Sequence, residues 1–164
     1  MSDPCQLAVF RTGAGYLVRI EGRCTMRESP TVRDFVCGAL EDGADVAIDL
    51  SRCEYLDSTF LGCLAMLHQR GETNPGSFTV VADEATRRRL LHAVRLDQLL
   101  TTVDQPPTVA DEAAPLTVAV PDREEFGRHM RDTHRHLADL GGPAAQTFRK
   151  IAERLDEELG PVEQ

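Results

Sequence analysis

The sequence predicts an α/β fold in which a mixed sheet of four to five strands is covered by helices. Short apolar runs with the length of strands alternate along residues 6–103 with segments that have helical spacing. Strands that alternate with helices need crossover connections, and these produce parallel pairs in one sheet. After residue 104 the pattern changes to a proline-containing segment and two amphipathic helices, which predicts an appendage to a domain at 1–104.

The first predicted element is a β-hairpin. Residues 6–11 (QLAVFR) and 16–21 (YLVRIE) are apolar runs of strand length. The glycines of residues 12–15 (TGAG) suit a tight turn between them. Gly22 is expected to end the second strand.

A helix should follow, with Ser29 as its N-cap and Pro30 at its first helical position. Gly43 is expected to stop this helix. Between them, apolar residues recur with helical spacing and form one face, made of Val32, Phe35, Val36, Ala39 and Leu40.

Residues 46–70 are the central stretch of the chain. A short apolar run at 46–50 predicts a buried strand, and an almost wholly apolar segment from Ser58 onward predicts a helix buried on most sides. Asp57, Ser58 and Thr59 all favour a helix N-cap. Ser58 is therefore expected at a helix end, near the surface.

Three further elements complete the predicted domain. Residues 77–82 form a β-rich run, and Asp83 can cap a helix at 84–94. A short final strand is expected at 99–103.

The rest of the chain is predicted as a linker and a helical hairpin. Residues 105–121 contain four prolines and mostly small or polar residues, although 116–120 could add an edge strand. Residues 122–159 show two amphipathic patterns separated by Gly141 and Gly142. Their apolar stripes need a partner: each other, the domain, a second copy of the chain as a homodimer, or another protein.

Composition narrows the function classes. The net charge of −9 argues against nucleic acid as the main partner, because phosphate binding needs a basic face. No apolar run has the length of a membrane span, and the first residues do not resemble a signal peptide. We expect a cytoplasmic protein without membrane insertion.

The cysteines are Cys5, Cys24, Cys37, Cys53 and Cys63. Their odd number and wide spacing predict free thiols in a reducing compartment rather than a disulfide framework. Cys37 and Cys63 fall within apolar helical patterns and should be small core residues.

No spacing in the sequence indicates an enzyme. Cys53 or Cys63 could act as a nucleophile with His68 or His92 as base, but no motif ties them together. We therefore expect no catalytic residues and no cofactor.

No metal site is expected either. His129, Asp132 and His136 fall on one side of the first tail helix, but the HExxH pairing of histidines is absent. A solvated helix edge is the better interpretation of these residues.

Residues 46–62 resemble the signature of the STAS domain, the family of bacterial anti-sigma-factor antagonists. That signature is an apolar strand ending in Asp, followed by D-S-[ST]-G-L-G at the start of a helix. The matching residues here are Asp49, Asp57, Ser58, Thr59, Leu61 and Gly62. The chain departs from the pattern at Phe60, where the family most often has Gly. The order of elements over roughly residues 5–103 also agrees with the STAS architecture.

The resemblance implies a protein-interaction switch that acts by partner switching in transcription regulation. STAS antagonists bind a serine-kinase anti-sigma factor when unphosphorylated, which releases the sigma factor. The kinase then phosphorylates the serine after the Asp, which is Ser58 here, with Thr59 as the weaker candidate. The implied partner surface is Asp57, Ser58, Thr59, Phe60 and Leu61, and Asp49 and Gly62 would structure the loop.

Physical chemistry is consistent with such a switch. A phosphate on Ser58 would be tolerated by its own helix, because free N–H groups and the helix dipole favour an anion. In a protein interface, the same dianion beside Asp57 would be expelled.

Two other interpretations remain open. Asp-Ser-Thr before an apolar run is also the pattern of any capped helix. The fold could also serve without phosphorylation, as an accessory or scaffold subunit, for example of a lipid transporter or signalling complex.

Overall fold

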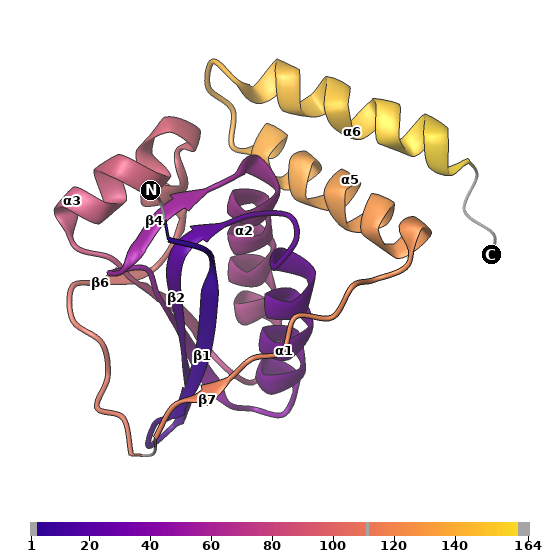
Figure 1. The fold of residues 1–164 in the computed structure, drawn as a ribbon. Coiled ribbons are helices and arrows are strands. Elements are labelled where there is room, and N and C mark those ends of the chain that lie inside the picture. Colours follow the sequence, from indigo (N-terminus) through magenta and orange to yellow (C-terminus); the bar gives the residue numbers. More distant parts are fainter. Residues whose placement is uncertain (1–2, 111, 161–164) are drawn as a thin grey trace.

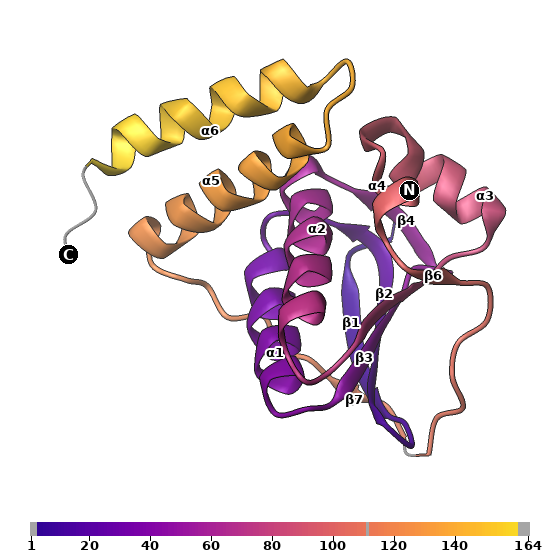
Figure 2. The ribbon, with the colours of Figure 1, turned by 180° about the vertical axis from the view of Figure 1, so that it is seen from behind.

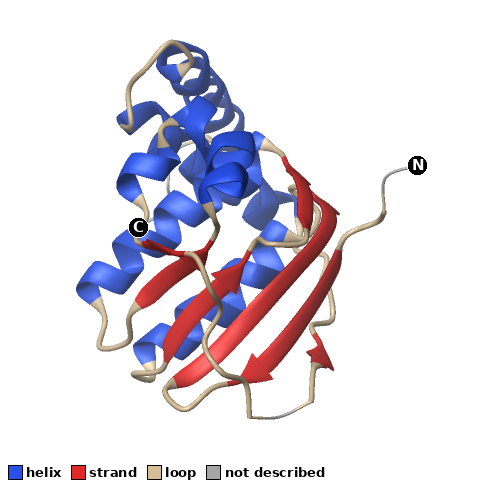
Figure 3. Ribbon diagram, turned by 90° about the vertical axis from the view of Figure 1, so that its left-hand side faces the viewer, coloured by secondary structure: helices blue, strands red, loops and turns tan. Residues whose placement is uncertain are grey.

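The computed structural model describes residues 3–110 and 112–160. A mixed sheet has helices α1 and α2 on one face, and the helical hairpin α5–α6 lies across one end of this pair (Figure 1). The strand order is β6-β5-β3-β2-β1-β7, with β4 paired to β2. Figure 3 shows the strands side by side with the helices behind them.

The N-terminal hairpin consists of β1 (Gln6–Arg11) and β2 (Gly15–Cys24), which pair antiparallel. The hairpin was predicted correctly, but Gly22 does not end β2. Gly22 adopts a left-handed conformation with φ 80°, and the register of pairing shifts between Gly22 and Arg23. The glycine thus introduces a bulge, after which β2 continues and pairs with another strand.

The centre of the sheet is parallel. β3 (Asp45–Asp49) pairs with β2 on one side and with β5 (Phe78–Val81) on the other. The parallel strand β4 (Cys53–Leu56) lies between the predicted strand at 46–50 and the predicted helix, where no strand was expected, and two of its four residues are exposed.

Among the described residues the sheet has seven strands, more than the expected four to five. Two of them have only two residues, β6 (Thr102–Val103) and β7 (Ala114–Pro115). The mixed α/β class itself is confirmed. β6 lies within the strand expected at 99–103, whereas β4 and β7 lie outside the expected strands. A strand of two residues such as β7 cannot produce a hydrophobic alternation.

Helix α1 (Ser29–Glu41) starts one residue earlier than predicted, because its N-cap is Glu28 and Ser29 is already helical. The Glu28 carboxylate turns back and accepts a hydrogen bond from the Thr25 amide at 2.9 Å. The Ser29 hydroxyl is consequently not used as a cap.

Helix α2 (Ser58–Thr73) is the central helix of the domain. The Asp57 carboxylate caps it by accepting a hydrogen bond from the Phe60 amide at 2.9 Å. Its buried residues join those of α1 and the facing side of the sheet in one core, which includes Val36, Ile48 and Leu64. Figure 2 shows α1 and α2 on the same side of the sheet.

The segment after β5 is helical but irregular. Asp83 caps it as predicted, accepting from the Thr86 amide at 2.9 Å. It comprises α3 (Glu84–Thr86), a π-helical turn (Arg87–Leu91), a 3₁₀ turn (His92–Val94) and, after left-handed Arg95, α4 (Leu96–Leu99). The predicted strand at 99–103 is reduced to β6 because α4 includes Leu99.

The proline-containing segment 105–121 follows the sheet. Its strand β7 pairs with the edge strand β1, and the Ala119 amide donates to Thr31 Oγ1 at 3.0 Å. The edge pairing predicted for 116–120 thus occurs just before that range.

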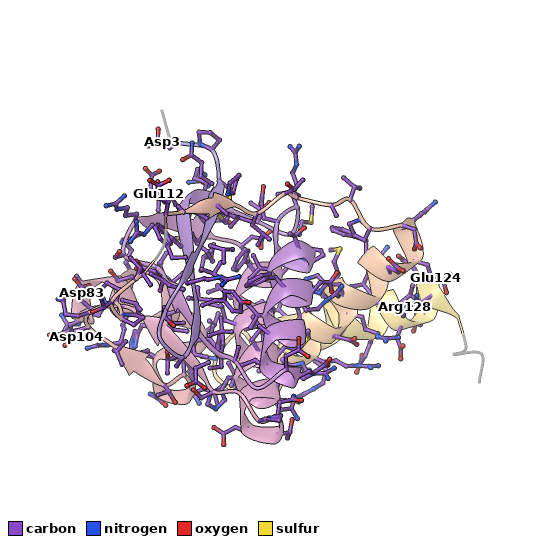
Figure 4. The ribbon with its side chains drawn as sticks, turned by 90° about the horizontal axis from the view of Figure 1, so that it is seen from below. Asp3, Asp83, Asp104, Glu112, Glu124 and Arg128 are labelled. Carbon is purple, nitrogen blue, oxygen red and sulfur yellow. A yellow bond between two sulfur atoms is a disulfide. The ribbon has the colours of Figure 1, made fainter. Side chains whose placement is uncertain are left out.

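The two tail helices are α5 (Arg123–Asp139) and α6 (Ala145–Leu159). Gly141 and Gly142, both with positive φ, turn the chain between them. α5 lies directly on α2, and α6 packs on the outer side of α5 (Figure 1). At the outer end of α5, Glu124 and Arg128 form an exposed ion pair on the opposite side of the molecule from Asp83 and Asp104 (Figure 4).

One disulfide corrects the expectation of free thiols. Cys5, just before β1, is bonded to Cys24 at the end of β2, with Cα atoms 4.9 Å apart. The antiparallel register of the hairpin brings these ends together, and a separation of nineteen residues gave no local sign of this. Cys37, Cys53 and Cys63 are free.

Candidate functional site

Ser58, the central candidate, is the first residue of α2 and is partly buried. Its Oγ lies 3.1 Å from Nε2 of His134 on α5. His134 Nδ1 lies 2.6 Å from the carbonyl oxygen of Met130, and only a protonated nitrogen can donate to a carbonyl. Nε2 of a neutral His134 is therefore the acceptor, and the Ser58 hydroxyl donates to it.

Asp57 ties the start of α2 to the turn before α1. While Oδ1 caps α2, Oδ2 accepts a second hydrogen bond from the Met26 amide at 2.7 Å. Both carboxylate oxygens are thus engaged by backbone amides, which fixes the backbone on which Ser58 sits.

A second serine–histidine pair lies beside the first. Ser29, the first residue of α1, has its Oγ 2.6 Å from Nε2 of His129 on α5. Arg33 donates to His129 Nδ1 at 2.9 Å, so the proton of the neutral ring is on Nε2 and is donated to Ser29.

His129 is held neutral. Its side chain is 1% exposed, and burial together with the nearby Arg33 guanidinium lowers its pKa to about 4. The interpretation of His129 as part of a solvated helix edge was wrong, because α5 turns this face toward α1. Among the described residues, no group of His, Cys, Asp and Glu is arranged to hold a metal ion.

Gly62 lies inside α2, not in the loop that precedes it, and marks the place where α5 comes closest. A Cβ at this position would lie 2.1 Å from the backbone oxygen of Thr133 and 2.7 Å from its Cβ. No side chain fits there, so the backbones of the two helices meet directly. Farther along α2, Gln69 Oε1 lies 2.8 Å from His136 Nε2.

Asp49 sits at the end of β3 and is 1% exposed. Its Oδ1 accepts from the Ser51 amide at 2.9 Å, and its Oδ2 lies 3.4 Å from Arg19 Nε. The carboxylate therefore holds the turn that leads from β3 into β4.

The other residues of the predicted partner surface are buried. Phe60 is fully buried in the core, so its expected place on the partner surface is corrected. Leu61 is 9% exposed and also belongs to the core, and Thr59 is 3% exposed. An aromatic fits in place of the usual glycine because it points inward.

The cysteine–histidine candidates do not form an active site in the structure. Burial raises the pKa of the Cys53 thiol to about 11 and raises that of the fully buried Cys63 as well, the opposite of an activated thiolate. His68 pairs with Glu72, and His92 with Asp97.

Sequence reasoning missed the two histidines that contact the serines. The helical spacing of α5 placed His129 and His134 on the helix but gave no information about which surface the helix contacts. One signal was present: a glycine inside a helix costs about 1 kcal/mol relative to alanine, so Gly62 in a helical pattern suggested a close backbone contact.

Comparisons with known proteins agree with this architecture. The family model described as "Mlab, STAS domain" matches residues 7–101, more than half of the chain. The fold and this match define a domain of STAS type, and the chain belongs to the STAS family.

A solved relative is similar in structure. The crystal structure of an anti-sigma factor antagonist from Mycobacterium paratuberculosis superposes with a TM-score of 0.54 at 26% sequence identity. The similarity covers 64% of this chain and 92% of that chain. A comparison with curated proteins found no match. The family match ends at residue 101, before the linker and the hairpin.

No helix among the described residues has both the length and the apolar composition to cross a membrane.

Proposed function

We propose that this STAS protein is an anti-sigma-factor-antagonist-like switch that binds a serine-kinase anti-sigma factor and is controlled by phosphorylation of Ser58. In this role it regulates transcription from the cytoplasm by partner switching. The observation that carries the proposal is the position of Ser58, a hydroxyl at the first residue of α2 on a backbone fixed by Asp57. The solved antagonist that the chain resembles supports the same role.

The local chemistry supports a switch that changes binding without unfolding the domain. A phosphate at the N-terminus of the sixteen-residue helix α2 meets free amides and a favourable dipole, worth roughly 0.3–1 kcal/mol. In a protein interface it would add nearly two negative charges beside Asp57, and the desolvation would cost several kcal/mol. Affinity would fall on the order of a hundredfold or more.

Ser58 is the preferred phosphorylation site over Thr59. Thr59 is 3% exposed, whereas Ser58 is only partly buried, and a kinase needs access to the hydroxyl. The chain acts in this proposal as a binding protein and not as an enzyme.

A second candidate function is that of an accessory or scaffold subunit that works without phosphorylation, for example in a lipid transporter. Two observations favour it: the matching family model carries the description Mlab, and the Ser58 hydroxyl already has a partner in His134. In that role the α1–α2 surface and the hairpin would form a permanent docking face.

The deciding experiment uses four full-length proteins: wild type, Ser58→Ala, Ser58→Glu and a control, Ser77→Glu. Ser77 is exposed just before β5, so the control adds the same charge away from the start of α2. Each is tested for binding to purified serine-kinase anti-sigma factors of the source organism, and wild type is incubated with each kinase and ATP. Partner capture from lysate extends the search beyond this panel.

The switch predicts that wild type, Ser58→Ala and Ser77→Glu bind one kinase, that Ser58→Glu does not, and that mass spectrometry finds phosphate on Ser58. Ser58→Ala should fold, losing about 1 kcal/mol with its bond to His134. If all four proteins hold the same partners and Ser58 is never modified, the accessory role replaces the switch.

A further inference from the structure

We propose that the ends of α1 and α2 around Ser58 form a helix-binding surface, and that the chain's own α5 occupies it in competition with the partner. The inference rests on the proposed function, because it concerns how the same surface is regulated. It assigns a role to the hairpin, which lies outside the matched family region.

The surface is shaped for a helix. Three small residues, Ser29, Ser58 and Gly62, lie within the first two turns of α1 and α2, and all three contact α5. Small residues allow two helix backbones to approach closely, and the two hydroxyls and the bare glycine leave room for a crossing helix. Figure 2 shows α5 crossing this end of the α1–α2 pair.

The contacts of α5 suit a reversible occupant. Its buried residues are the apolar Leu137 and Ala138 and four residues with polar side chains, His129, Arg131, Thr133 and His134. A hydrogen bond that is exchanged for water on release has a net value of only about 0.5–1.5 kcal/mol. A polar interface of this kind is weaker than the apolar core beneath it.

The path of the chain permits release. The hairpin follows all strands of the sheet, and its connection to the domain is the segment before Asp122. It can therefore leave the surface while every strand stays paired. A partner can bind only those molecules in which the hairpin has left the surface. The apparent affinity of the partner is therefore reduced in proportion to the fraction of such open molecules.

Phosphorylation and occupation by α5 exclude each other. The Ser58 oxygen and His134 Nε2 are 3.1 Å apart, a hydrogen-bond distance that leaves no room for a phosphorus atom with three oxygens. His134 is 3% exposed and packs against the Phe148 ring of α6, so it is enclosed between α2 and α6. A kinase must therefore meet the open form, and the phosphate keeps α5 away.

The sharpest test is to add a methyl group at the closest contact between α2 and α5, in a substitution called the wedge variant below. In the full-length chain, Gly62→Ala places a methyl group where it collides with the backbone of Thr133, while alanine favours α2 itself. The matched control is Gly38→Ala in α1, where a Cβ would meet nothing within 4 Å. Both variants make the same chemical change in a helix, but only the first pushes α5 away.

Access to the site is measured in a Ser58→Cys background in which Cys37, Cys53 and Cys63 are replaced by alanine, with a polymer-linked maleimide, so that all label on residues 53–70 is at residue 58. We expect the wedge to raise the labelling rate tenfold or more and to speed hydrogen exchange in α5, with β3 and β5 still protected. The control should change neither. Equal labelling and equal protection of α5 in the two variants would overturn the proposal.

A second variant decides the question if the wedge does not fold. His129→Ala removes the contacts of α5 with Ser29 and Arg33 on α1 and leaves Ser58 and Gly62 untouched. The same faster labelling and exchange are expected. A folded His129→Ala protein with wild-type labelling would contradict the proposal.

Kinase assays separate this inference from the proposed function. With Ser58 intact, Gly62→Ala should be phosphorylated faster than wild type and Gly38→Ala. If all three are phosphorylated at one rate, α5 does not compete, although the switch stands. If no kinase modifies any of them, the switch fails, and the labelling result alone decides whether α5 opens.

A chain carrying phosphoserine at residue 58 provides the reverse test. Hydrogen exchange in α5 should rise to the level of the wedge variant. If α5 keeps its wild-type protection, the phosphate fits beneath it and the mutual exclusion is wrong.

Discussion

Two carboxylates hold the backbone on which the candidate switch depends. Asp49 fixes the turn after β3, and Asp57 joins the start of α2 to the turn before α1. Each accepts a hydrogen bond from a backbone amide, so each acts on the position of the chain before any partner is present. Ser58 can then change its chemistry while its backbone stays in place.

The double role of Asp57 can be separated by substitution. Asp57→Ala removes both acceptors and should lower the free energy of unfolding by about 1–2 kcal/mol, the usual cost of an N-cap and more. Asp57→Asn keeps an oxygen for the Phe60 amide but presents an NH₂ group to Met26, so its loss should be intermediate. Urea unfolding of the three proteins measures this order. An Asn variant as stable as wild type would show that the contact with Met26 contributes nothing.

His129 should make hairpin docking sensitive to acid. Its pKa is about 4 when folded and near 6.5 when exposed, so between these values the unfolded state binds more protons. Stability is therefore complete above about pH 6.5 and falls as the pH drops toward 4. The groups that act on His129 are Arg33 from α1 and Asp132 and His134 from α5.

Thermal unfolding between pH 7 and pH 4 tests this dependence. The glutamine in His129→Gln does not titrate in that range. The melting temperature of this variant should therefore fall less than that of wild type as the pH decreases. Parallel curves for the two proteins would mean that His129 is not held neutral by its surroundings.

At the scale of elements, α5 is both a tail helix and a contributor to the core. Leu137 is 1% exposed and belongs to the same apolar cluster as the residues of α2 and the sheet. α6 lies outside α5 and is held to it by Asp156, which pairs with Arg131 and Arg135. The hairpin thus docks through one helix, and the other supports it.

Truncation of the apolar anchor should loosen this docking. Leu137→Ala is expected to cost about 2–5 kcal/mol because it removes buried methyl groups and leaves a cavity. Leu140, just beyond α5, is only partly buried, so Leu140→Ala should cost clearly less. Hydrogen exchange should rise mainly in α5 and α6. Equal effects of the two substitutions would argue against Leu137 as the anchor.

The elements that sequence reasoning found are those with long patterns. The hairpin β1–β2, α1, α2 and the two tail helices each repeat an apolar spacing over several residues. The strand β4 was missed because it has only four residues, and its two central residues, Glu54 and Tyr55, are exposed. So short a segment shows no apolar run. The cap of α1 shifted because the Glu28 side chain folds back on Thr25, a choice that depends on the turn geometry.

The candidate site was predictable only in part. Asp57 and Ser58 could be placed at a helix start because capping is a local property. Ser29 contacts His129, which is 100 residues away in the sequence, and Ser58 contacts His134, which is 76 residues away. These contacts are set by tertiary packing, which no local sequence pattern encodes. The pairing of Cys5 with Cys24 was missed for the same reason.

The whole molecule consists of a STAS domain and a hairpin that covers one end of its two central helices. The family match stops at residue 101, and the similar antagonist is covered over 92% of its length by 64% of this chain. Comparable domains thus fold around the same sheet and helices within a shorter chain. The hairpin is then an addition to this shared fold, and it enters the common core through Leu137.

Deletion of residues 122–164 tests this division. The remaining chain keeps every strand of the sheet, including β7, so we expect native circular dichroism and protected amides in β3 and β5. It should nevertheless unfold at lower temperature, because Leu137 no longer covers its part of the core and burial of such a side chain contributes about 1.5–3 kcal/mol. The newly exposed surface around Gly62 should bind an apolar dye. A fragment without a cooperative unfolding transition would show that α5 completes the core, and release of the hairpin would then require partial unfolding of the domain itself.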